Sequence, residues 1–314
     1  MDLRGVAMVT RAGTVRTELA GGLADAAAGV PCTLATTFQI CSISKQFAAV
    51  AALLLAEAGR LALDDPVDRW LPGGPPQWSR VTLHHLLSHT AGVPHWLEAP
   101  GLDPAEPTPP AERLAAIQAA PLRTAPGETW HYSSPGFVLV GLIVERASGQ
   151  PYARFLTERI LTPLGLAATS VGGPPPGPAA RGYRDGAPVT PFDLAAMAGT
   201  GDIWSTAADL ARFTAALHAG NLITNESLHA MLTPHAPIED DDEDLTTTGY
   251  GYGMFTGTFA GHAAYYHPGD NPGYLSFAGW IPDLSASLVI LANDESVVIP
   301  DLLRTLLPAA LGES

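Results

Sequence analysis

A serine and a lysine three residues apart are the pair in this sequence best suited to chemistry. Ser42 and Lys45 stand where an extended run, 36–41, meets an apolar helical pattern that starts at Phe47. Apolar residues recur there at i, i+3, i+4, i+7 and i+8, the spacing of a buried helix face. One helical turn separates Ser42 from Lys45, so both side chains project from the same side. A hydroxyl with an amine one turn away is the minimal pair for a serine nucleophile activated by lysine.

The use of lysine at this position strengthens the prediction. Lys45 is the only lysine among the 16 basic residues, and the others are all arginine. Arginine stays protonated in proteins, whereas a desolvated lysine can approach neutrality and accept a proton. The alternative is a partly buried lysine that only packs or caps a helix, and Ser-x-x-Lys alone does not exclude it. A sole lysine one turn into an apolar helix favours catalysis.

The composition describes an acidic globular chain. It has 314 residues, 46% hydrophobic and 15% charged, enough for one large domain or two coupled ones. The net charge of −15 argues against nucleic acid or an anionic membrane surface as partner. Cys32 and Cys41 provide no disulfide framework, and apolar runs such as 137–144 are too short to span a bilayer. The first residues lack a secretory pattern, so we expect a cytoplasmic location.

Three other polar features are expected to be structural. His84, His85 and His89 have no cysteine or carboxylate at ligand spacing, and adjacent histidines face differently on a helix, so we expect no metal and no other cofactor. The acidic run 239–244 is most simply a solvated loop. Thr206 followed by Asp209 predicts a capping box at a helix start, and we assign that carboxylate no chemistry.

The order of the remaining elements predicts the fold class. Strand patterns cover 5–10, 14–20, 251–260, 262–267, 274–280 and 285–292, with turns at Pro268-Gly269 and Pro282-Asp283. Helical patterns cover 111–120, 137–147, 152–161, 206–220 and 301–307. We therefore expect an α+β fold of the α/β-sandwich type, an antiparallel sheet flanked by helices and built from both chain ends. A mostly helical part (71–199) would be inserted into the α/β part (1–70 with 200–314), and the site would lie in the groove between them.

Three motifs in order resemble those of a known superfamily. They are Ser42-Ile43-Ser44-Lys45, Tyr132-Ser133-Ser134 and His267-Pro268-Gly269. With them the chain resembles the serine β-lactamase and penicillin-binding-protein superfamily, especially its branch of class C β-lactamases, esterases and D-aminopeptidases. The stretches 86–92 and 205–213 also look familial. The resemblance covers nearly the whole chain.

The resemblance implies a role for the matched catalytic residues. Ser42 would attack an acyl carbonyl and become the acyl-enzyme. Lys45 and Tyr132 would share the proton transfers, and which of the two is the general base stays open. The backbone N–H groups of Ser42 and Asp270 would form the oxyanion hole, with donors worth roughly 2.7–4 kcal/mol each. Judged without the other motifs, Tyr132 is better explained as a loop aromatic that packs on the helical part.

The second and third motifs, and the residue that follows the third, depart from the pattern of the relatives. Ser134 replaces the usual asparagine, and His267-Pro268 before Gly269 replaces Lys-Thr, although a plain strand histidine would look the same. Histidine is largely neutral near pH 7, proline lacks a donor, and Asp270 adds a negative charge beside the hole. We therefore expect poor binding of substrates with a free carboxylate, weak β-lactamase activity at most, and a preference for neutral or cationic esters and amides.

Three functional readings follow. The first is a Ser-Lys-Tyr hydrolase acting on a small ester, an amide or a short peptide, as an esterase, amidase or D-amino-acid peptidase. The second keeps the acyl-enzyme and transfers the acyl group to an amine or alcohol, as an acyltransferase, transpeptidase or cyclase of a biosynthetic pathway. The third is a non-catalytic descendant that binds a ligand. The sequence does not reveal the oligomeric state.

Overall fold

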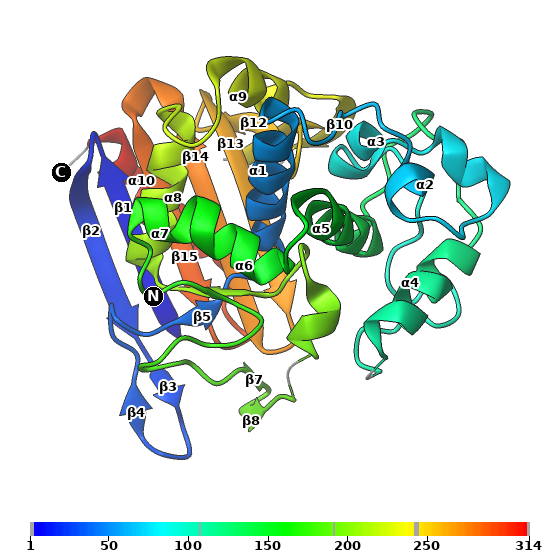
Figure 1. The fold of residues 1–314 in the computed structure, drawn as a ribbon. Coiled ribbons are helices and arrows are strands. Elements are labelled where there is room, and N and C mark those ends of the chain that lie inside the picture. Colours follow the sequence, from blue (N-terminus) through cyan, green and yellow to red (C-terminus); the bar gives the residue numbers. More distant parts are fainter. Residues whose placement is uncertain (1–2, 107, 191, 242–244, 313–314) are drawn as a thin grey trace.

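An eight-stranded antiparallel sheet is the frame of the molecule (Figure 1). The structure is a computed structural model and describes residues 3–106, 108–190, 192–241 and 245–312. In spatial order the strands are β10 (Ala236–Asp241), β11 (Leu245–Tyr250), β12 (Phe255–Phe259), β13 (His262–Asn271), β14 (Tyr274–Ile281), β15 (Ala286–Ala292), β1 (Gly5–Arg11) and β2 (Thr14–Gly21). The N-terminal hairpin joins the C-terminal strands where β1 pairs with β15. Both chain ends therefore complete one sheet, as the sequence predicts.

The two faces of this sheet are covered by different helices. Val6 and Met8 of β1 belong to the apolar cluster that contains α1 (Ser44–Glu57) and α8 (Ala207–His218). Ala7 and Val9, which alternate with them, belong to a second cluster with α10 (Ile299–Leu311). Successive strand residues point to opposite faces, so this alternation buries the sheet between two helical layers. The arrangement confirms the predicted fold class.

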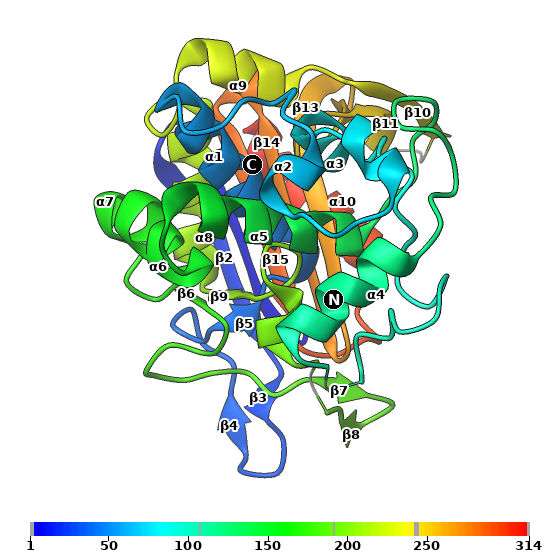
Figure 2. The ribbon, with the colours of Figure 1, turned by 45° about the vertical axis from the view of Figure 1, so that its right-hand side comes forward.

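The remaining helices lie at several places around the sheet (Figures 1 and 2). To the right of α1 in Figure 1 are α2 (Val67–Trp70), α3 (Leu83–Leu87), α4 (Pro110–Ala119) and α5 (Ser134–Ser148). The short helices α6 (Tyr152–Leu156) and α7 (Thr162–Leu164) lie in front of the sheet, and α9 (Asn225–Leu232) lies at the top of the view. Shorter strands are β3 (Leu23–Asp25) with β4 (Val30–Pro31), β5 (Phe38–Gln39) with β9 (Ile203–Ser205) and β6 (Ser170–Val171), and β7 (Tyr183–Arg184) with β8 (Ala187–Pro188). The exact division into two subdomains stays a prediction. In the described residues, no helix combines the length and the apolar character needed to cross a bilayer.

Three local predictions are wrong. The acidic run expected as a loop begins inside β10, an edge strand, and its residues 242–244 lie outside the described part of the chain. Edge strands commonly carry charged residues because charge discourages pairing with other chains. Pro268-Gly269 is not a turn but lies inside β13, where the two residues pair with Phe277 and Ser276 of β14.

The third correction concerns the cap of α8. The Thr206 hydroxyl does accept a hydrogen bond from the Asp209 backbone N–H, as expected of an N-cap. The Asp209 carboxylate, however, does not reach back to the cap. It accepts from the Ala168 backbone N–H at 2.8 Å and from the Thr169 hydroxyl at 3.0 Å. Asp209 therefore anchors the loop before β6 rather than completing a capping box.

Candidate active site

Ser42 lies in a tight turn between β5 and α1. The turn is a 3₁₀ helix, Cys41–Ile43, that runs directly into α1. Cys41 has a φ of +52°, a left-handed conformation that is uncommon for a residue other than glycine and is typical of strained functional turns. Its buried side chain fills space under β14, while Ser42 keeps partial exposure. The turn thus presents the Ser42 hydroxyl at the surface of an otherwise buried segment.

Lys45 lies beneath this hydroxyl and is fully buried. Its Nζ is 3.0 Å from Ser42 Oγ, 3.2 Å from Ser134 Oγ and 3.1 Å from the Thr200 carbonyl oxygen. A neutral amine offers two N–H groups and one lone pair. The carbonyl takes one N–H and Ser134 can take the other, which leaves the lone pair free to accept the Ser42 proton. The three contacts therefore suit a neutral lysine as well as a charged one.

The surroundings of Lys45 favour the neutral amine. Burial lowers the pKa of Lys45 well below its ordinary 10.5, and only Cys41 and Asp202 oppose this shift. Burial also raises the pKa of the Cys41 thiol, so that neighbour stays uncharged. Asp202 is buried too, and burial raises its pKa to about 7. Among the described residues, neither of the two groups that raise the pKa of Lys45 is therefore a permanent counter-charge that would hold the amine in its protonated form.

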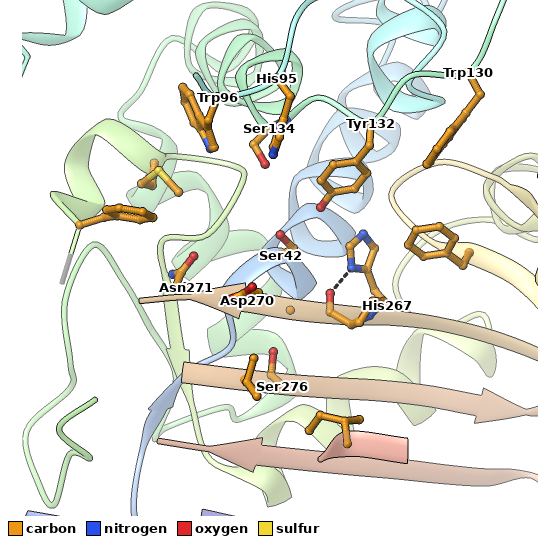
Figure 3. Close-up of a pocket in the computed structure, with 17 residues that line it drawn as sticks. Ser42, His95, Trp96, Trp130, Tyr132, Ser134, His267, Asp270, Asn271 and Ser276 are labelled. Carbon is orange, nitrogen blue, oxygen red and sulfur yellow. Dashed lines mark hydrogen bonds between the residues drawn. The ribbon is translucent and has the colours of Figure 1, made fainter. Parts of the chain in front are cut away.

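Tyr132 comes from the segment before α5 and lies close to both Lys45 and Ser42. Its ring centroid is 4.8 Å from Lys45 Nζ, and Figure 3 shows its hydroxyl pointing toward Ser42. Burial raises the pKa of Tyr132, although hydrogen bonding with Ser42 and Ser134 opposes the shift. The phenol is therefore protonated near neutral pH. In this state it can donate a proton but is a poor base.

The third motif forms the opposite wall. β13 lies against the Cys41–Ile43 turn, and Gly269 makes the contact possible. A Cβ atom on Gly269 would overlap Ser276 Oγ and would lie 2.8 Å from both the Cys41 Cβ and the Ile40 carbonyl oxygen. β12 pairs with β13 only as far as Tyr266, so the following residues have one strand edge turned to the cavity. An oxyanion hole at Ser42 and Asp270 needs this close approach.

His267 is buried and neutral. Its Nδ1 contacts the Pro268 carbonyl, drawn as a dashed line in Figure 3, and its Nε2 is 3.0 Å from the Tyr250 hydroxyl. A carbonyl only accepts, so Nδ1 carries the proton and Nε2 accepts from Tyr250. Burial lowers the pKa of His267 to about 3, with Lys45 adding to the effect. Both ring nitrogens are occupied, so His267 cannot replace a cationic lysine that holds a carboxylate.

These residues surround one cavity of about 470 Å³ (Figure 3). Ser42, Tyr132, Ser134, His267, Gly269 and Asp270 all line it. Figure 3 shows Trp96 and Trp130 on opposite sides of Ser42, and Phe192, Met197 and Leu275 add apolar surface. The lining contains no lysine or arginine among the described residues, and Asp270 is its one carboxylate. The cavity is therefore apolar with a negative charge at one wall.

Two neighbours of Tyr132 were not foreseen as part of the site. His89 packs its ring 4.4 Å from the Tyr132 ring, centroid to centroid, and His95 packs at 5.5 Å. His95 also lines the cavity. The sequence drew attention to His89 as part of a familial stretch and as a candidate metal ligand that was not expected to bind, and it offered no signal for His95. Both lie in the segment after α3, which is distant in sequence from the motifs.

The fold and this arrangement are those of the serine β-lactamase and penicillin-binding-protein superfamily. The profile of the Beta-lactamase family matches residues 1–307, so the chain belongs to that family. Among solved structures, a penicillin-binding protein from Bacillus halodurans is 28% identical, with a TM-score of 0.83 over 97% of this chain and 95% of that one. A D-amino acid amidase from Ochrobactrum anthropi SV3, solved with L-phenylalanine, is 25% identical, with a TM-score of 0.85 over 98% and 94%.

Curated relatives are longer than this chain. Esterase EstB from Burkholderia gladioli is 38% identical over 200 residues, which are 58% of this chain and 50% of that protein. The putative penicillin-binding protein PbpX from Bacillus subtilis (strain 168) is 30% identical over 266 residues, 82% of this chain and 64% of that protein. The chain thus spans about half to two thirds of the length of these two relatives.

Proposed function

We propose that this protein is a serine hydrolase that works through an acyl-enzyme on Ser42. The observation that carries the proposal is the 3.0 Å contact between Lys45 Nζ and Ser42 Oγ, with the amine fully buried. A desolvated amine at this distance can remove the hydroxyl proton as the oxygen attacks an acyl carbonyl. Membership of the Beta-lactamase family supports the same chemistry.

The proton path assigns different work to the two candidate bases. Neutral Lys45 accepts the Ser42 proton, since its pKa is lowered, and the tetrahedral oxyanion is held by the N–H groups of Ser42 and Asp270. Protonated Tyr132 then donates to the leaving group and is reprotonated from Lys45, whose Nζ lies 4.8 Å from its ring centroid. In deacylation the protons move in the reverse direction: the attacking water gives its proton to Tyr132 as Tyr132 passes one to Lys45, and Lys45 returns a proton to the Ser42 oxygen as it leaves. The alternative, Tyr132 as the base, is disfavoured because burial raises its pKa.

The cavity supports a small apolar ester or amide as substrate. Its aromatic walls match apolar acyl and leaving groups, and Asp270 disfavours a carboxylate near the scissile bond. His267, which is buried and neutral, offers such a carboxylate no compensation. The names of two relatives, an esterase and a D-amino acid amidase, agree with this class. We further propose that nitrocefin and penicillins are poor substrates and that the protein works in the cytoplasm.

Covalent labelling tests the proposal. A fluorophosphonate probe should add to Ser42, as read by peptide mapping, and S42A should remain unlabelled while keeping its fold by circular dichroism. A panel of p-nitrophenyl esters, D-amino-acid amides and nitrocefin then defines the substrate. Absence of an adduct from the folded wild-type protein would leave only a ligand-binding role.

Acyl transfer is the second candidate because Ser42 would form the same acyl-enzyme. Adding an amine such as a D-amino acid to the ester assay separates the two activities. Hydrolysis predicts free acid as the main product at all amine concentrations. A product that shifts to the amide, without change in the rate of ester consumption, would establish transfer instead.

A further inference from the structure

Two imidazoles hold the backbone on the C-terminal side of Tyr132. The Ser133 backbone N–H donates to His89 Nδ1 at 3.1 Å, and the Ser134 backbone N–H donates to His95 Nδ1, also at 3.1 Å. A backbone N–H can only donate, so neither Nδ1 can carry a proton. Each ring must therefore be neutral, with its hydrogen on Nε2.

The same segment is fixed to the loop after α3 at two more points. The His131 backbone N–H donates to the His89 carbonyl at 2.8 Å, and the Ser133 hydroxyl donates to the Pro94 carbonyl at 3.0 Å. His89 itself has a φ of +58°, a left-handed conformation that turns its ring and its carbonyl toward the same segment. Four hydrogen bonds thus connect residues 131–134 to residues 89–95.

The two rings also flank the Tyr132 side chain. His89 is 2% exposed and packs at 4.4 Å between ring centroids, while His95 meets Tyr132 edge-on at 5.5 Å. Neither imidazole is hydrogen-bonded to Ser42 or Lys45 among the bonds found in the described residues. Their hydrogen bonds go to the backbone of the tyrosine segment, and their rings pack against Tyr132 and against other aromatic side chains such as Tyr250 for His89 and Trp96 for His95.

We propose that His89 and His95 are positioning residues, whose unprotonated Nδ1 atoms accept the Ser133 and Ser134 N–H groups and so hold the Tyr132 hydroxyl over Ser42. The proposal rests on the proposed function, in which Tyr132 protonates the leaving group. Placement of such a group must be tight, because a displacement of roughly 1 Å can cost about 10²-fold in rate.

The electrostatic environment keeps these acceptors available. Burial lowers the pKa of both imidazoles, and Lys45 and His131 add to the shift. His267 and His95 lower the pKa of His89 further, whereas Glu98 opposes the shift at His95. The pKa of His95 falls to about 4. Both rings therefore stay neutral through the pH range in which Lys45 must act as a base. Protonation of either Nδ1 would place its N–H against the backbone N–H that it now accepts from.

Two substitutions of one residue test the role. In H95N the amide oxygen can occupy the place of Nδ1 and accept from the Ser134 N–H. In H95Q the longer side chain carries the amide oxygen toward the place of Nε2, away from that N–H. With a p-nitrophenyl ester we expect H95N to stay within about threefold of wild-type kcat, while H95Q and H95A lose roughly 10²-fold in kcat with little change in KM. H89N should also retain activity, because asparagine tolerates the left-handed backbone and offers the same acceptor.

A second readout does not depend on turnover. Amide hydrogen exchange at residues 131–136 should quicken in H95Q and H95A and should return to the wild-type rate in H95N. Equal kcat in H95N and H95Q, or unchanged exchange in H95A, would overturn the proposal. If wild-type protein turns over no ester but exchange responds as expected, the positioning contacts stand and the proposed hydrolase function fails instead.

Discussion

Adding one methyl group at Gly269 should separate the nucleophile from its oxyanion hole. The Cβ of G269A would lie 2.8 Å from the Cys41 Cβ and from the Ile40 carbonyl oxygen and would overlap Ser276 Oγ. Two of these three neighbours are carbon and backbone atoms of the turn that carries Ser42. They cannot move aside as a flexible side chain could, so β13 or the turn itself must shift.

The magnitude follows from this overlap. Real Cβ atoms essentially never approach other heavy atoms below 3.0 Å, so the 2.8 Å contacts require a shift of a few tenths of an ångström, and relief of the Ser276 overlap requires more. Overpacking of this kind costs about 1–3 kcal/mol of stability. Loss of one oxyanion donor costs roughly 10²–10³ in kcat. We expect G269A to lose about 10²-fold in kcat with a modest fall in Tm.

The assay pairs esterase kinetics with thermal unfolding. G173A is the matched control, because Gly173 has open space around its Cβ position and no positive φ, and it should match the wild type in both measurements. In the double variant G269A/S276A one of the three obstacles is removed, so activity should recover only in part. Wild-type kcat and Tm in G269A would refute the close packing of β13 against the nucleophile turn.

Two further substitutions test the electrostatics of the site. Burial raises the pKa of Asp202 from 3.8 to about 7. Between these two pH values the folded state keeps a proton on Asp202 that the unfolded state loses, so the stability of the wild type falls as the pH rises from 3.8 to about 7. D202N cannot ionise at this position. Its free energy of unfolding in urea, relative to that of the wild type, should therefore be higher at about pH 8 than at about pH 4. An equal difference between the two proteins at both pH values would contradict a buried carboxyl with a raised pKa. D270N removes the one carboxylate that lines the cavity in the described part of the chain, and the lost repulsion of a substrate carboxylate is worth about 1 kcal/mol. The kcat/KM for nitrocefin should therefore rise about fivefold relative to that for a neutral ester, and an equal change for both substrates would exclude charge as the cause.

Local periodicity explains what the sequence could predict about the site. One helical turn separates Ser42 from Lys45, and their side-chain atoms lie 3.0 Å apart. The alternating strands at both chain ends likewise predict one sheet, because strand periodicity and short turns are encoded by neighbouring residues. Tyr132 was predicted only through the resemblance, since no local pattern connects it with Ser42, and its function stays a prediction.

Long-range contacts explain what the sequence could not predict. Pro268-Gly269 has turn composition, yet both residues continue a strand, because pairing with β14 persists there while β12 no longer pairs on the other edge. Proline is tolerated where a strand edge is unpaired, and glycine is required by the approach of Cys41. The histidine acceptors lie in the segment between α3 and α4 and contact the start of α5, 44 and 39 residues further along the chain. Such contacts arise only when the chain is folded, and no residue spacing announces them.

The proposed mechanism requires a neutral Lys45, and the sequence offers a direct way to measure the charge state of this amine. Lys45 is the single lysine of the sequence, so protein labelled with ¹³Cε-lysine should show one side-chain resonance. Its chemical shift, followed against pH, reports the pKa of the proposed base without any substitution. We expect the amine to titrate well below 10.5, because burial lowers its pKa. A lysine that remains protonated up to 10.5 or beyond would contradict a neutral base at Ser42.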